Sequence, residues 1–133
     1  MVKNEKEDLD SLDQIIKLVD LFYGKVKEDN LIRPIFEDRI KGHWDKHLQK
    51  MYTFWQTVLL AEHTYYGSPF PPHAKLPIDK KHFERWLLLF QETLRENFFG
   101  EKATEALWRA AKMAEMFQIK IDYYRDNNIS PLG

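Results

Sequence analysis

Residues 44–59 decide the fold class of this chain, and they read Trp44-Asp45-Lys46-His47-Leu48-Gln49-Lys50-Met51-Tyr52-Thr53-Phe54-Trp55-Gln56-Thr57-Val58-Leu59. Apolar side chains recur in this stretch at intervals of three and four residues. Because an α-helix has about 3.6 residues per turn, these intervals bring the apolar side chains onto one face. The stretch therefore predicts an amphipathic helix that buries this face.

The residues before this stretch predict a first helix and then a turn. Ser11-Leu12-Asp13-Gln14 is a capping box, which is typical of a helix N-terminus. Apolar residues follow it at helical spacing, namely Leu12, Ile15, Ile16, Val19, Phe22, Tyr23 and Val26. We expect this helix to end near Glu28-Asp29-Asn30. Since Pro34 disfavours helical geometry at Arg33, a turn region with the short anchor Ile35-Phe36 should link the two helices.

Two more helices are predicted after a proline-rich segment. Residues 63–80 contain four prolines, so at most one short helical turn fits there. Asp79 is a candidate cap for the next helix, whose apolar stripe runs from Phe83 towards Gly100. The last helix carries small and apolar residues at Ala103, Ala106, Leu107, Ala110, Met113, Ala114, Phe117, Ile121 and Tyr124. With no alternating strand pattern, the sequence predicts an all-α domain of four long helices.

Composition narrows the class of protein. The 133 residues suit one domain, 1–133, with a polar N-terminal arm at 1–10 and a polar C-terminal tail at 126–133. The formal net charge of -1 disfavours nucleic acid and anionic membranes as partners. No stretch approaches about 20 apolar residues, and no signal peptide is evident, so we expect a cytoplasmic protein without membrane insertion.

The five histidines differ in context. His43 and His47 have the spacing of the H-E-x-x-H zinc motif, but Trp44 stands where that motif has its glutamate. His63 and His82 lie at the ends of elements among polar residues. His73 follows two prolines and is flanked by Phe70 and Leu76, which suits metal ligation as well as simple loop packing.

Several stretches, in the correct order, resemble the third group of truncated haemoglobins. Leu21-Phe22-Tyr23-Gly24-Lys25-Val26 is similar to the distal-tyrosine segment of that family, and Pro34-Ile35-Phe36 to the turn whose phenylalanine packs on the haem. His47 to Trp55 resembles its distal helix, and Phe83-Glu84-Arg85-Trp86-Leu87 its tryptophan segment. The resemblance runs from about Leu12 to Tyr124. It implies a truncated (2-on-2) globin fold, in which two antiparallel helix pairs sandwich a haem.

The resemblance also implies a haem site. His73 would be the proximal ligand of the iron, while Tyr23, His47 and Trp86 would stabilise a bound gas on the distal side. The haem slot would be lined by Phe36, Met51, Phe54, Trp55, Phe70, Leu76, Phe83 and Phe117, with Lys50 near a propionate. His47 could point inwards, act as a gate or ligate the iron, and the gate is preferred. Because the chain has no cysteine, the cofactor would be non-covalent haem b.

The function expected from this site is binding of dioxygen, nitric oxide or carbon monoxide. Nitric oxide dioxygenase activity, with an electron donor or reductase as partner, and peroxidase-like activity are two enzymatic alternatives. A haem-free four-helix interaction module is the alternative from another class. A di-iron carboxylate bundle would need Glu-x-x-His on two helices, and the nearest match is Asp79-Lys80-Lys81-His82. We expect a monomer or weak dimer.

Overall fold

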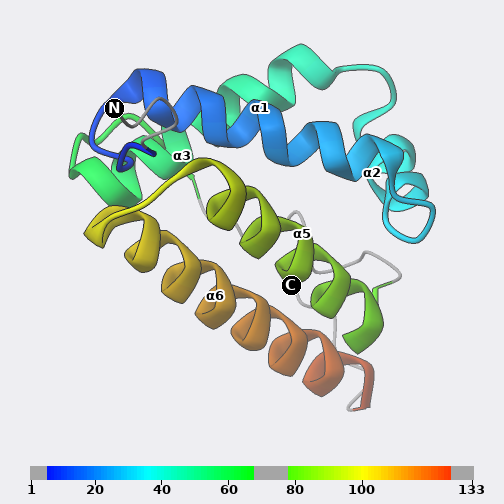
Figure 1. Cartoon of the computed structure of the whole chain (residues 1–133). Helices are drawn as coiled ribbons and strands as arrows, with labels where there is room; N and C mark the ends of the chain where they lie inside the picture. Colours follow the sequence, from blue (N-terminus) through cyan, green and yellow to red (C-terminus); the bar gives the residue numbers. More distant parts are fainter. Residues whose placement is uncertain (1–5, 68–77, 127–133) are drawn as a thin grey trace.

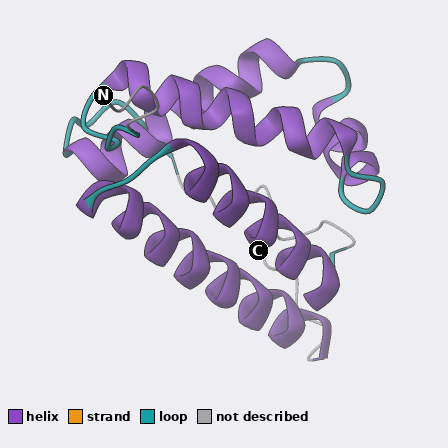
Figure 2. Ribbon diagram, in the orientation of Figure 1, coloured by secondary structure: helices purple, strands orange, loops and turns teal. Residues whose placement is uncertain are grey.

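The chain folds into helices, as a computed structural model that describes residues 6–67 and 78–126 shows. Within these residues the helices are α1 (Leu12–Glu28), α2 (Arg33–Ile40), α3 (Trp44–Leu60), α5 (Lys80–Asn97) and α6 (Glu101–Asp126). Figure 2 shows helices and loops alone in this part of the chain. The predicted all-α class is therefore confirmed.

The helices form two antiparallel pairs that lie against each other (Figure 1). α1 packs against α3, and α5 packs against α6. Contacts of α1 with α5, and of α3 with α6, join the two pairs. The predicted 2-on-2 arrangement is confirmed, and it places the apolar faces of all four long helices in one core.

Helix caps explain where two of these helices begin. Ser11 Oγ accepts a hydrogen bond from the backbone N–H of Gln14 at 3.3 Å, so the predicted cap of α1 is present. At the start of α5, Asp79 forms a capping box with His82, whose Nδ1 accepts the backbone N–H of Asp79 at 2.9 Å. The predicted role of Asp79 is confirmed, and His82 gains a structural role that its polar context did not indicate.

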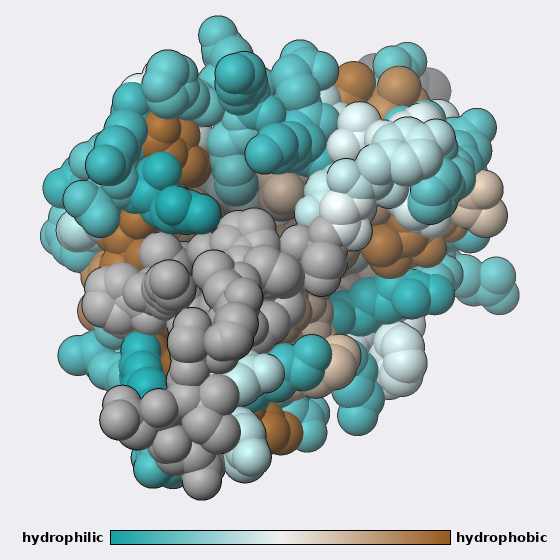
Figure 3. Space-filling model, turned by 180° about the vertical axis from the view of Figure 1, so that it is seen from behind, coloured by the Kyte–Doolittle hydropathy of each residue, from teal (hydrophilic) through white to brown (hydrophobic). Residues whose placement is uncertain are grey.

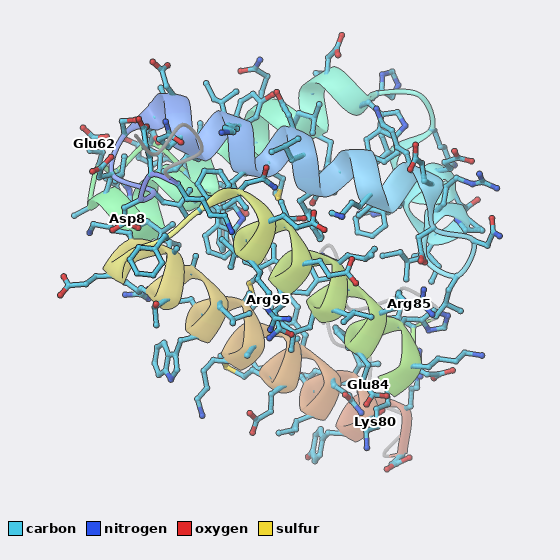
Figure 4. All side chains as sticks on the ribbon, viewed as in Figure 1. Asp8, Glu62, Lys80, Glu84, Arg85 and Arg95 are labelled. Carbon is cyan, nitrogen blue, oxygen red and sulfur yellow. The ribbon has the colours of Figure 1, made fainter. Side chains whose placement is uncertain are left out.

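The prediction of a turn at Arg33 and Pro34 is wrong, because both residues belong to helix α2. Pro34 lies in the first turn, where a backbone N–H has no partner within the helix, so the missing donor costs nothing there. The carboxylate of Asp29 accepts the N–H groups of Leu31 and Ile32 and so organises the turn before the helix. Asp29 also accepts a hydrogen bond from Arg85 at 2.9 Å, which ties this corner to α5. Figure 4 shows Arg85 on that side of α5.

Helix α5 ends at Asn97, and not near Gly100 as the apolar stripe predicted. Phe98 is extended, and the next residue, Phe99, donates its backbone N–H to the carbonyl of Glu7 at 3.1 Å. Part of the expected polar arm therefore packs against the helical domain, although Lys6, Glu7 and Asp10 are exposed. Leu9, within it, is fully buried.

We call the end of the molecule where this arm meets α6 the polar junction, and define it as residues 6–9, Leu59 and 98–103. The carboxylate of Asp8 accepts the backbone N–H groups of Lys102 and Ala103 in the first turn of α6, at 3.0 and 2.8 Å. Figure 4 shows Asp8 beside this turn. Burial by itself raises the pKa of Asp8, but the hydrogen bonds from Lys102, Leu9 and Ala103 together hold it below its ordinary value.

A hydrogen bond between side chains joins the first helix pair on its outer surface. Tyr52 of α3 donates its hydroxyl to Asp20 of α1 at 2.5 Å. Partial burial and this bond to a carboxylate raise the pKa of Tyr52 to about 12. The surface seen from behind is mostly hydrophilic, with scattered hydrophobic residues (Figure 3). No helix in the described residues is long and apolar enough to cross a membrane.

Candidate functional site

A cavity of about 460 Å³ lies between the two helix pairs. This volume is in the range of about 300–1,000 Å³ that is typical of sites for small molecules and cofactors. Each of the helices α1, α2, α3, α5 and α6 contributes to its wall, which is mainly aromatic and aliphatic. The apolar part of the lining consists of Val19, Phe22, Ile32, Ile35, Phe36, Ile40, Met51, Phe54, Trp55, Ile78, Phe83, Trp86, Phe90, Met113, Ala114 and Phe117.

All predicted site residues that the structure describes line this cavity. They come from every helix and include Tyr23, Phe36, His47, Lys50, Met51, Phe54, Trp55, Phe83, Trp86 and Phe117. His73, Phe70 and Leu76 lie outside the described residues. His47, Met51 and Trp55 lie on successive turns of α3, and this spacing brings all three to the cavity lining.

Three stacked rings form a rigid wall of the cavity. Phe90 lies between Trp55 and Trp86, with ring centroids 5.2 Å and 5.5 Å apart and interplanar angles of 21° and 8°. Phe22 meets both Phe90 and Trp86 edge-on. Because Phe90 and Phe22 are buried, this stack is held from behind by the core. All three stacked rings belong to the apolar lining of the cavity.

Tyr23 and His47 meet at another wall of the cavity. Their rings are perpendicular, with centroids 5.0 Å apart, and Phe36 contacts both rings edge-on. Burial raises the pKa of the Tyr23 phenol above its ordinary value. Among the described residues, no group forms a hydrogen bond with its hydroxyl. Tyr23 therefore contributes to the cavity lining a phenol that keeps its proton at neutral pH.

The polar part of the lining is basic. Arg39, Lys46 and Lys50 line the cavity together with His43 and His82, and the lining residues in the described part of the chain include no aspartate or glutamate. Of the three cations, the sequence indicated Lys50 alone. Lys46 lies one turn before Lys50 on the same helix, which is a signal that could have found it. The sequence did not indicate Arg39 as a lining residue, because a turn was predicted where α2 lies.

Tyr65 is a further lining residue that sequence patterns missed. It lies in the loop after α3, and its ring meets Phe54 edge-on with centroids 5.3 Å apart. The hydroxyl of Thr57 accepts its backbone N–H at 2.9 Å and so ties the loop to the helix. Burial raises the pKa of Tyr65 as well. No periodicity extends into this loop, so only the folded chain brings Tyr65 to the cavity.

Comparison with known proteins agrees with this geometry. The sequence profile of the Bacterial-like globin family matches residues 7–120. The chain belongs to this family. It is 37% identical over 110 residues to "Group 3 truncated hemoglobin ctb" of Campylobacter jejuni subsp. jejuni serotype O:2, a match that covers 80% of this chain and 87% of the relative. The crystal structure of group III truncated hemoglobin from Campylobacter jejuni is also similar, with a TM-score of 0.80 and 33% identity, covering 97% of this chain and 98% of that one.

Family membership means that this globin is a haem protein that binds diatomic gases in general. The residues present fit a haem. Its porphyrin faces are apolar and its edge carries two acidic propionates, so a suitable site combines apolar walls with cations. The cavity has aromatic walls and three cationic side chains, and its described lining lacks acidic residues.

Proposed function

We propose that this globin holds haem b non-covalently in the cavity and binds dioxygen, nitric oxide or carbon monoxide on the side of Tyr23 and His47. The observation that carries the proposal is Tyr23, a buried tyrosine of the cavity lining whose hydroxyl has no hydrogen-bond partner among the described residues, with the ring of His47 beside it. An O–H donor in such a place has little structural use, but it suits a small ligand that gains negative charge.

The walls would hold the cofactor by apolar contact and by charge. The stack of Trp55, Phe90 and Trp86 supplies a flat surface, and no cysteine is available for a covalent link. Arg39, Lys46 and Lys50 are the candidates for pairing with the propionates, because they are the cations of the lining. His73 is proposed as the iron ligand on the strength of the family resemblance.

The protein itself would contribute to gas binding through hydrogen-bond donors near the ligand and through apolar walls that exclude water from the cavity. Haem supplies the ferrous iron that takes up the gas. Tyr23 would donate its hydroxyl proton to a ligand with partial negative charge, and His47 and Trp86 are further N–H donors on the lining. A net hydrogen bond contributes about 1 kcal/mol, and the apolar surroundings of Tyr23 strengthen it. Two such donors would slow the loss of the ligand by roughly one to two decades.

Titration of the purified protein with haemin tests the proposal. We expect one haem per chain, a Soret band, and a shift of that band after reduction with dithionite and addition of carbon monoxide. A protein that takes up no haemin would contradict the proposal and favour the haem-free interaction module. Nitric oxide dioxygenase and peroxidase-like activity remain predictions that the same preparation can test.

Single histidine substitutions test the proposed iron ligand. His73→Ala should abolish or greatly weaken haem binding, whereas His43→Ala, His47→Ala and His82→Ala should retain it, although all three side chains line the cavity. His63→Ala is the matched control, because His63 is exposed and lies outside the lining. An unchanged spectrum of the His73→Ala protein would exclude His73 as the ligand.

A further inference from the structure

Trp44 contacts two polar residues of the cavity lining, Tyr23 and His47. It is the first residue of α3, and its ring centroid lies 6.1 Å from that of Tyr23 and 6.2 Å from that of His47. Both contacts are edge-on, and Trp44 itself is not part of the cavity lining. It therefore acts on the cavity through its neighbours and not by touching a ligand.

Lys27 also contacts Trp44. Its ammonium nitrogen lies 4.6 Å from the centroid of the Trp44 ring, close enough for a cation–π interaction. Lys27 belongs to the last turn of α1, so this contact connects the end of α1 to the start of α3. The Trp44 ring thus contacts both an exposed lysine on α1 and the imidazole of His47.

Among the described residues, the aromatic rings of Tyr23, Phe36 and Trp44 pack edge-on against the ring of His47, with centroids 5.0 to 6.2 Å away. A side chain on a helix changes direction by rotating about χ1, and rings packed on several sides restrict that rotation. We propose that Trp44, held in place by Lys27, is a positioning residue that keeps His47 turned into the cavity. This inference rests on the proposed function, because it assigns the control of gas entry to residues outside the gas site.

Two substitutions remove the contacts that are proposed to keep His47 turned into the cavity. In Trp44→Leu, loss of an aromatic contact should decrease the fraction of molecules with His47 inward, and carbon monoxide should associate about threefold to tenfold faster. Lys27→Met removes the cation and keeps the length of the side chain, and it should accelerate association about twofold to fivefold. Trp44→Phe and Lys27→Arg keep a ring and a cation, so both should restore rates near those of the wild type.

A structural readout accompanies the kinetics. Nuclear Overhauser effects between the imidazole protons of His47 and the ring protons of Tyr23 report the inward position directly. They should weaken in Trp44→Leu and Lys27→Met, both before haem is added and in the carbon monoxide form. The matched controls are Trp108→Leu, at an exposed tryptophan of α6, and Lys17→Met, which removes the cation over Phe98. Both controls should leave the rate and the Overhauser effects unchanged.

The outcomes separate this inference from the proposed function. If haem binds and both Trp44→Leu and Lys27→Met retain the wild-type rate and Overhauser effects, Trp44 does not position His47. If Trp44→Leu fails to fold, the association rate and the Overhauser effects of Lys27→Met test the positioning of His47. If the wild type takes up no haem, the proposed function fails, while the Overhauser effects in the haem-free protein still test the positioning of His47.

Discussion

The polar junction and the cavity are built by different interactions. At the junction, directed hydrogen bonds join segments far apart in the sequence, such as Asp8 with the first turn of α6 and Lys102 with the carbonyl of Leu59 at 2.7 Å. At the cavity, the walls are rings in edge-on and stacked contact, and the Tyr23 hydroxyl forms no hydrogen bond with any described residue.

This difference indicates a division between stability and ligand binding. A satisfied hydrogen-bond network at a helix end stabilises one backbone geometry and leaves no group free for a ligand. Aromatic packing maintains the shape of a wall while a polar group in that wall stays available. We therefore expect substitutions at the junction to lower the free energy of unfolding, and substitutions at Tyr23 to change ligand kinetics.

The largest effect is expected at Gly100. Its φ of +141° is rarely adopted by other residues, and an added Cβ would lie 2.4 Å from Cγ of Asp8. Gly100→Ala should lower the free energy of unfolding by about 3 kcal/mol, because backbone strain adds to the displacement of Asp8 from α6. Urea unfolding followed by far-ultraviolet circular dichroism measures it.

Gly24→Ala is the matched control for this substitution. Gly24 is an exposed residue within α1, and an added Cβ there would meet nothing within 4 Å. Alanine should stabilise that helix by about 0.5–1 kcal/mol. Equal effects at the two glycines would contradict the special role of Gly100.

Asp8→Ala should lower the free energy of unfolding by about 1.5 kcal/mol, because two N–H groups of α6 lose their acceptor. The pKa of Asp8 is lowered in the folded state, so its contribution is fully present above the ordinary value of 3.8 and is lost as the pH falls below it. The difference between wild type and variant should therefore shrink in acid. Asp10→Ala, at an exposed residue of the same arm, should show neither effect.

Tyr23→Phe should accelerate dissociation of dioxygen about tenfold, which corresponds to one lost hydrogen bond. The free energy of unfolding should change by less than about 0.5 kcal/mol, since the hydroxyl has no partner among the described residues. Stopped-flow displacement of dioxygen measures the rate. Tyr65→Phe, at another cavity tyrosine, should leave it unchanged, and an unaltered rate in Tyr23→Phe would exclude Tyr23 as the donor.

The smallest effect is expected at Lys102, whose ammonium group donates to the last turn of α3. Lys102→Met should lower the free energy of unfolding by about 0.7 kcal/mol, because a cation near a helix C-terminus is stabilising. Lys112→Met, at an exposed position of the same helix, should change it less. If the two variants unfold alike, the contact between Lys102 and Leu59 contributes nothing measurable.

Local patterns predicted most of the fold, and the family resemblance indicated many of the residues that line the cavity. The spacing of Met51 and Trp55 from His47 places the three residues on one helix face, and this holds for any partner that the face packs against. The caps at Ser11 and Asp79 can be predicted because they depend only on residues nearby in the sequence. The turn expected at Pro34 was wrong because the preference of a residue before proline is weak. The carboxylate of Asp29 accepts the N–H groups of Leu31 and Ile32, and these hydrogen bonds fix the turn before Arg33. They favour a helix start at Arg33 more strongly than the following proline disfavours it.

The sequence by itself determined the helices, their buried faces and the family resemblance, because these follow from periodicity, capping and order along the chain. Only the tertiary structure decided which separate segments meet. Asp8 reaches α6 across more than ninety residues, Lys27 meets Trp44 from a different helix, and Arg39 of α2 joins Lys50 of α3 at the cavity. Charged side chains carry no periodic signal that distinguishes a solvated position from a partnered one, so such pairs appear only when the helices pack.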